Sequence, residues 1–302
     1  GLAGRLARLI QETGPLTLAQ YMTLCLHDPA EGYYATRPAL GADGDFITAP
    51  EVSQMFGEMI GVWAVSVWEA MGRPAPVRLV ELGPGSGALI SDLLRAVKGQ
   101  PAFRAAIDLW LVELSAPLRR AQAARLDGAA VSFAASLDQV PADAPVILIG
   151  NEFLDCFGVR QFVRRDGAWL EHRVGLDADG GLCLGFAPPP SGFSAPDDAP
   201  EGAVLEISEA QEALGEGIGL RMAEAGGGGP GAPPLPQLVV LDGEMPRMSG
   251  RDAAAALREL LGVPVTLAVC ELEGVPVWLA VWLALGVPVT LAVCELEGVP
   301  VR

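Results

Sequence analysis

The spacing of hydrophobic residues changes character part-way along the chain. Residues 1–76 carry apolar positions at helical spacing, interrupted by a polar, glycine-bearing loop at 37–50, and are predicted to be mostly helical. Beyond them, VRLVEL at 77–82, DLWLVEL at 108–114 and PVILIGNEF at 145–153 have the length and composition of buried strands, and the first two precede helical patterns. This alternation predicts an α/β fold in which helices cover both faces of a doubly wound, mostly parallel sheet.

Two further segments complete the predicted organisation. The stretch 159–186 contains RQFVRRDGAWLEHRV and DADGGLCLGF, whose Asp-Gly and Gly-Gly turns separate strand-like runs, so it predicts an antiparallel β-ribbon insertion. AGGGGPGAPPLP at 225–236 has the composition of a linker. We therefore expect an N-terminal helical segment at 1–76, a core with its ribbon at 77–224, and a divergent tail at 237–302.

The tail is repetitive. GVPV begins at residues 262, 274, 286 and 298, so a 12-residue period runs to the end of the sequence. Unchanged repeats fit a recent duplication or an artefact better than a selected function. The 21 uncharged residues that precede Glu295 reach the length of a membrane-spanning helix. Their prolines and glycines and the missing basic flank argue against such a helix.

Composition restricts the class of protein. The 302 residues are 51% hydrophobic, enough for a sizeable core, and carry a formal net charge of -17. This charge repels nucleic acid and favours a basic ligand or partner, although acidity of this kind more often serves only solubility. The five cysteines lack CxxC spacing, so we expect reduced thiols and no metal site. The start of the chain has no signal-peptide pattern, which predicts the cytoplasm of a bacterium or the mitochondrial matrix.

The strongest chemical signal is ELGPGSG, which begins at Glu81. This residue ends the first predicted strand, and Gly83, Gly85 and Gly87 allow a sharp turn and a close approach of the backbone to a ligand. A dinucleotide-binding turn uses similar glycines, but its spacing is GxGxxG, and Glu81 would repel a pyrophosphate while suiting an ammonium group. Glu113 ends the next strand, where a carboxylate accepts both hydroxyls of a ribose, a group that both cofactors contain. The discrimination comes from the glycine spacing and from Glu81. The motif therefore favours S-adenosylmethionine over a nicotinamide cofactor.

A second polar cluster follows the strand PVILIG. Asn151, Glu152 and Asp155 of NEFLD are expected in the same crevice, because the carboxyl ends of parallel strands meet at one edge of a sheet. Two carboxylates beside a sulfonium donor suit a cationic acceptor. A guanidinium fits best, since its N–H groups match carboxylates and its high pKa requires anionic neighbours that take up a proton. The pattern predicts these three residues as catalytic, while an ordinary strand-end cap is the alternative.

Seven blocks of sequence occur in order along the first 220 or so residues. They are GPLTLAQYM at 14–22, HDPAEGYY at 27–34, GDFITAPEVSQMFGEMIG at 44–61, VELGPGSGALISDLL at 80–94, VELSAPLRRAQ at 112–122, NEFLDCFGVRQF at 151–162 and EISEA at 206–210. Together they resemble the MidA family of methyltransferases, which includes a mitochondrial arginine methyltransferase that assists assembly of respiratory complex I.

The resemblance implies a class I, Rossmann-like methyltransferase fold with S-adenosyl-L-methionine as the cofactor. It implies that Glu81, the three glycines and Glu113 hold the donor, and that GDFITAPEVS, with Asp45, Thr48 and Ser53, folds over it. It also implies methylation of an arginine of a protein substrate, with a subunit of respiratory complex I as the candidate partner. Membrane and nucleic acid are not expected as partners.

The sequence departs from the family in two places. Cys156 and Gly158 replace a small residue and a proline after the NEFLD aspartate, which affects the acceptor side. The family's strand ending in Asp-Tyr-Gly is missing after the linker, where LVVLDG at 238–243 could stand in for it. The same stretch resembles the centre of a response-regulator receiver, with Asp242 at the phosphoacceptor position, but the receiver's acidic pair and final lysine are absent, because Lys98 is the only lysine.

Two alternatives to a working methyltransferase stay open at this point. The first is a binding or assembly module that retains the donor site but has lost turnover with its altered C-terminal part. The second is a nicotinamide-dependent oxidoreductase, which the GxGxG spacing disfavours. It also lacks an obvious hydride-relay residue, because His27 and His172 are the only histidines.

Overall fold

The computed structural model describes residues 1–36, 49–226 and 237–241. Asp45, Thr48, Asp242 and the repeats of the tail lie outside the described residues. The helices are α1 (Leu2–Thr13), α2 (Leu18–His27), α3 (Tyr33–Thr36), α4 (Ala49–Val52), α5 (Gln54–Ala70), α6 (Ala88–Ala96), α7 (Pro101–Ala106), α8 (Ala116–Arg125) and α9 (Glu209–Gly226), with 3-10 turns η1 (Val97–Gly99), η2 (Leu137–Gln139) and η3 (Leu154–Cys156). The strands are β1 (Leu16–Thr17), β2 (Val77–Leu82), β3 (Ile107–Val112), β4 (Val131–Ala134), β5 (Val146–Asn151), β6 (Arg160–Arg165), β7 (Ala168–Leu176), β8 (Leu182–Ala187), β9 (Val204–Ile207) and β10 (Gln237–Leu241).

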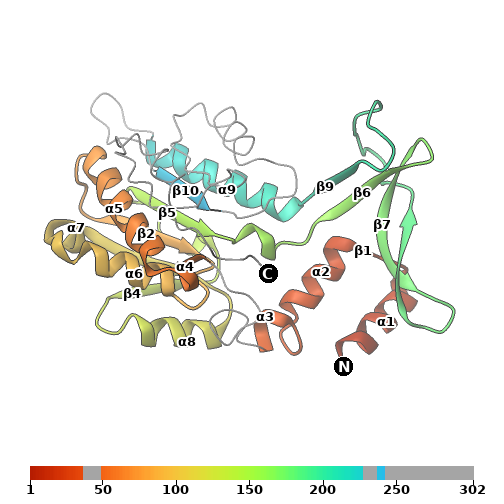
Figure 1. Ribbon diagram of the computed structural model, residues 1–302, viewed down its shortest axis with the longest axis horizontal. Coiled ribbons are helices and arrows are strands. Elements are labelled where there is room, and N and C mark those ends of the chain that lie inside the picture. The colour runs from red at the N-terminus through yellow and green to blue at the C-terminus, as the bar shows by residue number, and fades with distance from the viewer. Residues whose placement is uncertain (37–48, 227–236, 242–302) are drawn as a thin grey trace, which may run out of the picture.

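The core is a parallel sheet with the strand order β10-β5-β2-β3-β4 (Figure 1). From β2 the chain builds outward through β3 to β4, then returns to place β5 and β10 on the other side of β2. This reversal is the doubly wound topology, so the predicted α/β fold class is confirmed. Every residue of β2 is buried, as expected of a central strand covered on both faces. β10 pairs with β5 where LVVLDG was predicted to supply a strand.

Helices cover both faces of this sheet. On one face, Ile60 and Trp63 of α5 and Leu93 of α6 pack against buried residues of β2 and β5. On the other face, Ile218 of α9 packs against the side chains that the same strands direct to that face, among them Val80. Burial of apolar area on both sides stabilises the sheet by about 25 cal/mol per Å². Among the described residues, no helix combines the length and apolar composition needed to cross a membrane.

Two glycines of α5 let α6 lie close to it. A Cβ atom at Gly57 would come within 2.7 Å of the Asp92 Cβ and 2.8 Å of the Leu89 carbonyl oxygen, and one at Gly61 would lie 3.0 Å from the Leu93 carbonyl oxygen. A side chain at Gly57 would therefore push the two helices apart, and one at Gly61 would require α6 to shift by a few tenths of an ångström. Because α6 starts at the end of the glycine motif, this packing also fixes the first turn after the motif relative to the core.

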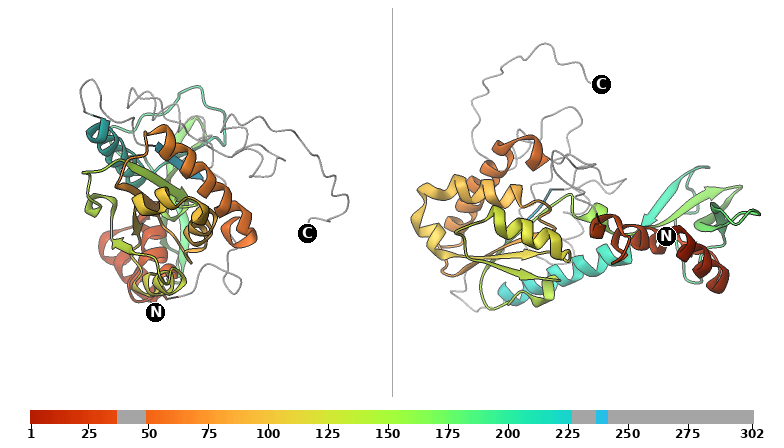
Figure 2. Two further views of the ribbon diagram at one scale, coloured as in Figure 1. Left: turned by 90° about the vertical axis from the view of Figure 1, so that its left-hand side faces the viewer. Right: turned by 90° about the horizontal axis from the view of Figure 1, so that it is seen from below.

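The predicted ribbon forms a separate antiparallel sheet in the order β1-β7-β6-β9, and β8 also pairs with β7. The β6–β7 turn is the predicted Asp-Gly pair: Asp166 and Gly167 have φ values of 51° and 74°, as a type I′ turn requires. β1 and β9 extend the sheet beyond the predicted 159–186. Figure 2 shows this sheet projecting from one end of the core.

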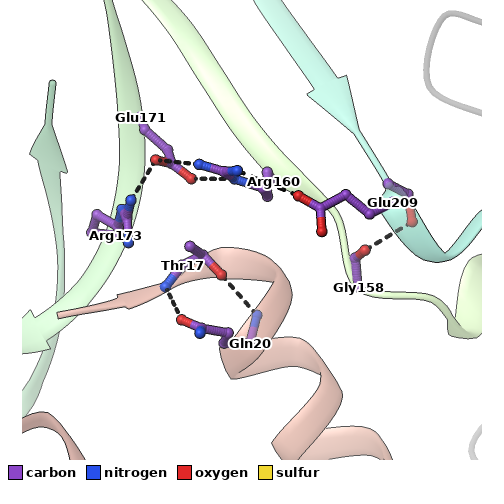
Figure 3. Close-up of polar contacts among 8 residues, drawn as sticks. Thr17, Gln20, Gly158, Arg160, Glu171, Arg173 and Glu209 are labelled. Carbon is purple, nitrogen blue, oxygen red and sulfur yellow. Dashed lines mark hydrogen bonds and ion pairs between the residues drawn. The ribbon is translucent and has the colours of Figure 1, made fainter. Parts of the chain in front are cut away.

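The N-terminal segment packs on the ribbon as well as on the core. Leu6 and Ile10 of α1 bury their side chains against Leu16 and Val174 of the ribbon sheet. Thr17 and Gln20 form a capping box that starts α2: the Gln20 N–H donates to Thr17 Oγ1 at 3.0 Å, and the Thr17 N–H donates to Gln20 Oε1 at 2.9 Å (Figure 3). α2 therefore leaves the ribbon in a fixed direction.

An ion-pair network ties the ribbon to α9. Glu171 is fully buried and accepts from Arg160 Nε at 2.8 Å and from Arg173 Nη2 at 2.6 Å (Figure 3). Arg160 also lies 3.5 Å from Glu209, in the first turn of α9. Burial raises the pKa of the Glu171 carboxyl, but the two guanidinium groups outweigh it and the pKa is lowered on balance. The carboxylate therefore stays ionised inside the sheet.

Candidate active site

The carboxyl ends of β2, β3 and β5 open into one cleft of about 2000 Å³, which continues along α2. Seven of the residues predicted for the site line it: Glu81, Gly83, Gly85, Glu113, Asn151, Glu152 and Asp155. Gly87 is the N-cap residue of α6 and is not among the residues that line the cleft. Ser53 is exposed at the start of α5 and does not line the cleft, so its part in covering the donor stays a prediction.

All three glycines of the motif have the left-handed backbone that glycine favours. The φ values of Gly83, Gly85 and Gly87 are 60°, 52° and 78°. At Gly83 space is limiting too, because a Cβ atom there would come within 2.4 Å of the Phe153 ring. Phe153 belongs to NEFLD, so the first glycine lets the two predicted motifs lie in direct contact.

Glu81 presents a buried carboxyl group to this turn. The residue is 2% exposed, and its Oε2 has no hydrogen-bond partner among the described residues. Burial raises the pKa of the carboxyl to about 8. An unpartnered acidic oxygen of this kind suits a cationic ligand group that restores the charged form, such as the ammonium of an amino acid moiety.

Glu113 is held by hydrogen bonds to both of its oxygens. Its Oε1 accepts from the Ser115 N–H at 2.8 Å, and its Oε2 accepts from Gln122 Nε2 at 3.3 Å. Burial raises the pKa of the Glu113 carboxyl, while these hydrogen bonds and the nearby Arg119 oppose the rise. The carboxylate is thus fixed at the cleft wall and retains lone pairs for a ligand's hydroxyl groups.

The NEFLD residues line the cleft at the end of β5, on the other side of β2 from Glu113. Asn151 is the last residue of β5, and Asp155 lies in the turn η3. Glu152 has a φ of 50°, an unusual backbone for a residue with a side chain, and such strain concentrates at functional sites. The block HDPAEGYY lines the cleft here too, through His27, Tyr33 and Tyr34. Burial, followed by the nearby Cys156, raises the pKa of the Tyr34 hydroxyl to about 12.

His27 connects α2 to this wall. Its Nε2 lies 2.8 Å from the Cys156 carbonyl oxygen, and its ring stacks on Tyr34 with centroids 5.6 Å apart. These contacts give His27 a packing role, in agreement with its position at the end of α2.

The sequence pattern did not predict a contact between the glycine motif, α4 and α8. Ser86 of the glycine motif donates a hydrogen bond to Glu51, and Arg125 of α8 donates to Ser86 Oγ at 2.8 Å and pairs with Glu51 at 3.6 Å. The cluster joins α4 to the glycine turn. GDFITAPEVS, the block expected over the donor, ends in α4, so its described end is attached to the donor loop.

The charge of the cleft is strongly one-sided. Its wall includes six acidic residues and one guanidinium, Arg160, which is already paired with Glu171 and Glu209. Acidic groups therefore outnumber cationic ones on the wall, which favours a cationic side chain over an anionic one. The acidic residues on the wall are Glu51, Glu81, Glu113, Glu152, Asp155 and Glu209.

A parallel doubly wound sheet with a glycine turn, a strand-end carboxyl that suits an ammonium group and a second that suits a ribose is the arrangement expected of an S-adenosylmethionine-dependent methyltransferase. In agreement with this, residues 59–232 match the family described as "Putative S-adenosyl-L-methionine-dependent methyltransferase", and the chain belongs to this family. Family membership decides against the nicotinamide-dependent alternative.

Curated relatives are similar over the same region. The protein arginine methyltransferase NDUFAF7, mitochondrial, from Bos taurus is 37% identical in an alignment of 227 residues that covers 67% of this chain and 50% of that protein. The Homo sapiens protein of the same name is 37% identical over 62% of this chain and 47% of its own length. The Xenopus laevis protein is 45% identical over 56% and 44%. The chain thus spans about half the length of the curated relatives it matches.

A solved structure supports the fold assignment. It is a methyltransferase-like superfamily member from Burkholderia thailandensis, crystallised with S-adenosyl-homocysteine, and it superposes with a TM-score of 0.61 at 28% identity, covering 72% of this chain and 58% of that one. A native crystal structure of a protein of this superfamily from the same organism superposes with a TM-score of 0.58 at 29% identity, covering 72% and 57%.

Proposed function

We propose that this chain binds S-adenosyl-L-methionine in the cleft and transfers its methyl group to an arginine side chain of a protein. The observation that carries the proposal is the buried carboxyl of Glu81, whose Oε2 lacks a partner among the described residues at the turn where all three glycines are left-handed. Both features suit a ligand whose ammonium group pairs with Glu81 and whose neighbouring atoms lie close to the backbone of the glycine turn. The S-adenosyl-homocysteine bound by the Burkholderia protein has this chemistry.

Different residues bind different parts of the donor. Glu81 holds the ammonium, and the left-handed backbone at Gly83 and Gly85 admits the ligand close to the turn. Glu113, fixed by Ser115 and Gln122, accepts the ribose hydroxyls. When bound, the donor supplies a methyl group on a sulfonium, which leaves sulfur by in-line displacement. Asp45, Thr48 and Ser53 remain proposed as parts of the cover.

The NEFLD wall acts on the acceptor. Glu152 and Asp155 accept N–H bonds from the guanidinium and align one of its nitrogens with the methyl group, while Asn151 supplies a neutral polar partner. As the new N–C bond forms and the C–S bond breaks, that nitrogen releases a proton to one of the two carboxylates. Their placement opposite Glu113 in a strongly acidic cleft favours a cationic acceptor over a carboxylate or a hydroxyl.

The partner is proposed from the relatives. Their names assign them protein arginine methylation and a mitochondrial location. By similarity, we propose a protein substrate for this chain, with a subunit of respiratory complex I as the candidate, and a site of action in the mitochondrial matrix or the bacterial cytoplasm.

A transfer assay tests the proposal. The purified chain is incubated with methyl-labelled donor and a panel of peptides that contain arginine, lysine or glutamate as the acceptor, and the labelled residue is identified by mass spectrometry. Label on arginine, reduced at least tenfold in Asp155→Asn, supports the proposal. Label on lysine or carboxylate would reject the acceptor assignment.

A second candidate is a donor-binding assembly module without turnover. The observation in its favour is that Cys156 and Gly158 depart from the MidA pattern directly after the NEFLD aspartate, on the acceptor side of the cleft. It predicts that donor binds, no acceptor is labelled, and the protein still captures the peptides. The same assay, run beside a donor titration, separates the two candidates.

A further inference from the structure

Gln122 of α8 is a fully buried polar side chain at the junction of two donor-site elements. It is 0% exposed, and its stem packs on Gly87, whose missing Cβ would lie 3.4 Å from Gln122 Cγ. Its Nε2 donates to the Gly85 carbonyl oxygen at 2.7 Å and to Glu113 Oε2 at 3.3 Å. One amide group thus joins the glycine turn after β2 to the carboxylate after β3.

The chemistry of the contacts fixes the orientation of this amide. The Gly85 carbonyl and the Glu113 carboxylate are both acceptors, so the NH₂ end must face them. The other end, Oε1, is buried and has no partner among the described residues. An unpaired buried oxygen costs about 1–3 kcal/mol, which the two donated hydrogen bonds must offset. The position requires a side chain that donates twice, which glutamine does and glutamate or leucine does not.

Gln122 and Ser115 together fix the orientation of the Glu113 carboxyl group. Ser115 holds Oε1 of Glu113, and Gln122 holds Oε2, so the carboxylate plane cannot rotate without losing a hydrogen bond. The Gly85 contact fixes the distance from that carboxylate to the glycine turn. A ligand that spans turn and carboxylate, as a ribose does, binds best when this distance is preset.

We propose that Gln122 is a positioning residue for the methyl donor: it keeps the Glu113 carboxyl group directed into the cleft, and it holds the Gly85 turn at a fixed distance from it. This inference rests on the donor binding proposed above. Gln122 does not line the cleft and touches the donor only through Glu113 and Gly85.

The charged neighbours of this junction stay the same in all Gln122 variants. Arg119 of α8 donates from Nε to the Glu113 carbonyl oxygen at 2.6 Å. Arg125 of the same helix pairs with Glu51, beside Ser86. Glu81 ends the neighbouring strand. Because these groups contribute equally to wild type and variants, the ratio of their donor affinities isolates the side chain at 122.

The test is calorimetric titration with S-adenosylhomocysteine between pH 5.5 and 8. Gln122→Leu removes both hydrogen bonds and is expected to weaken donor binding about tenfold at every pH. Gln122→Glu places a second carboxyl beside Glu113. At pH 5.5, where the new group is protonated, it still donates one hydrogen bond. At pH 8 it ionises, and the ratio of its dissociation constant to that of wild type rises by about a further tenfold.

The control is Gln100→Glu, which adds the same charge at an exposed position before α7. Its affinity ratio to wild type should stay near one at every pH. The melting temperature of each ligand-free variant is recorded alongside, and if Gln122→Leu does not fold, Gln122→Glu carries the test. A pH-independent ratio for Gln122→Glu would overturn this inference while leaving the proposed function intact. Failure of wild type to bind S-adenosylhomocysteine would overturn both.

Discussion

Gly158 lies directly against Ala19: a Cβ atom at position 158 would come within 2.4 Å of the Ala19 carbonyl oxygen. The contact places α2 against the segment that follows NEFLD, and His27 makes a second link at the far end of the helix. Gly158 is one of the departures from the MidA pattern. Its physical reason in this chain is that a side chain there would push α2 off the acceptor wall.

Gly158→Ala is expected to loosen this contact and destabilise the fold by about 1–3 kcal/mol, the usual range for an overpacked site. The melting temperature should fall by several degrees, while the affinity for S-adenosylhomocysteine stays within about twofold of wild type, because the glycine turn is not touched. Gly4→Ala, in α1 with nothing within 4 Å of its Cβ position, is the control and should not lower the melting temperature. Equal melting temperatures for Gly158→Ala and wild type would contradict the account.

Gly83→Ala tests the close approach at the donor turn. The new Cβ would collide with the Phe153 ring at 2.4 Å in addition to straining a backbone with φ 60°. We expect donor affinity to fall more than tenfold, as measured by calorimetry. Gly128→Ala is the matched control: its φ is 84°, but nothing lies within 4 Å of its Cβ position, so it should cost about 1 kcal/mol of stability and leave donor binding unchanged. Equal donor affinities for the two variants would be inconsistent with the proposed turn.

Glu81 predicts a pH dependence with a definite sign. Its pKa rises from the ordinary 4.5 to about 8 in the ligand-free fold, so the folded chain holds a proton that the unfolded chain releases. The stability that this proton contributes is fully present below about pH 4.5 and is lost as pH rises through 8. Glu81→Gln removes this loss, and denaturation at pH 5, 7 and 8.5 should show its stability relative to wild type increasing with pH.

The same residue gives a binding signature. When the ammonium of the donor binds at pH 7, the Glu81 carboxyl ionises and releases its proton. Calorimetry in buffers of different ionisation enthalpy should therefore show proton release for wild type and none for Glu81→Gln, whose affinity is also weaker. Proton release that persists in Glu81→Gln would assign the titration to another group.

Glu152 and Asp155 predict a separation of donor binding from turnover. Glu152→Gln and Asp155→Asn keep the shape of the wall but remove the negative charges that take up the proton of the guanidinium. Methyl transfer to an arginine peptide should fall about 100-fold, the lower range for loss of a general base, while donor affinity stays within threefold. The exposed Asp138→Asn, in η2, is the control for a lost carboxylate elsewhere. Unchanged transfer in both wall variants would remove these residues from the mechanism.

The central strands and the donor turn were readable from the sequence because their signals are local. β2 spans the predicted 77–82, and β3 and β5 lie within or next to their apolar runs. The Asp166–Gly167 turn was likewise specified by its own two residues. Membership of the methyltransferase family followed from motif order in the same way, and the family match confirms it.

The missed features depend on contacts between distant segments. β4 and β9 have four residues each and are mostly half-buried, so neither shows a clear period. The roles of Gln122 and Glu51 appear only once α8 and α4 lie beside the glycine turn. The proposed role of Ser53 rested on resemblance alone, and the structure places it at a helix start outside the cleft lining.

The central claim is that the cleft beyond Glu81 and Glu113 holds the methyl donor. Its most direct test is calorimetric titration of the purified chain with S-adenosylhomocysteine at pH 7. The account predicts one binding site per chain and strong weakening in both Glu81→Gln and Gly83→Ala. Absence of binding by the wild-type chain, or binding as tight as wild type in both variants, would contradict it.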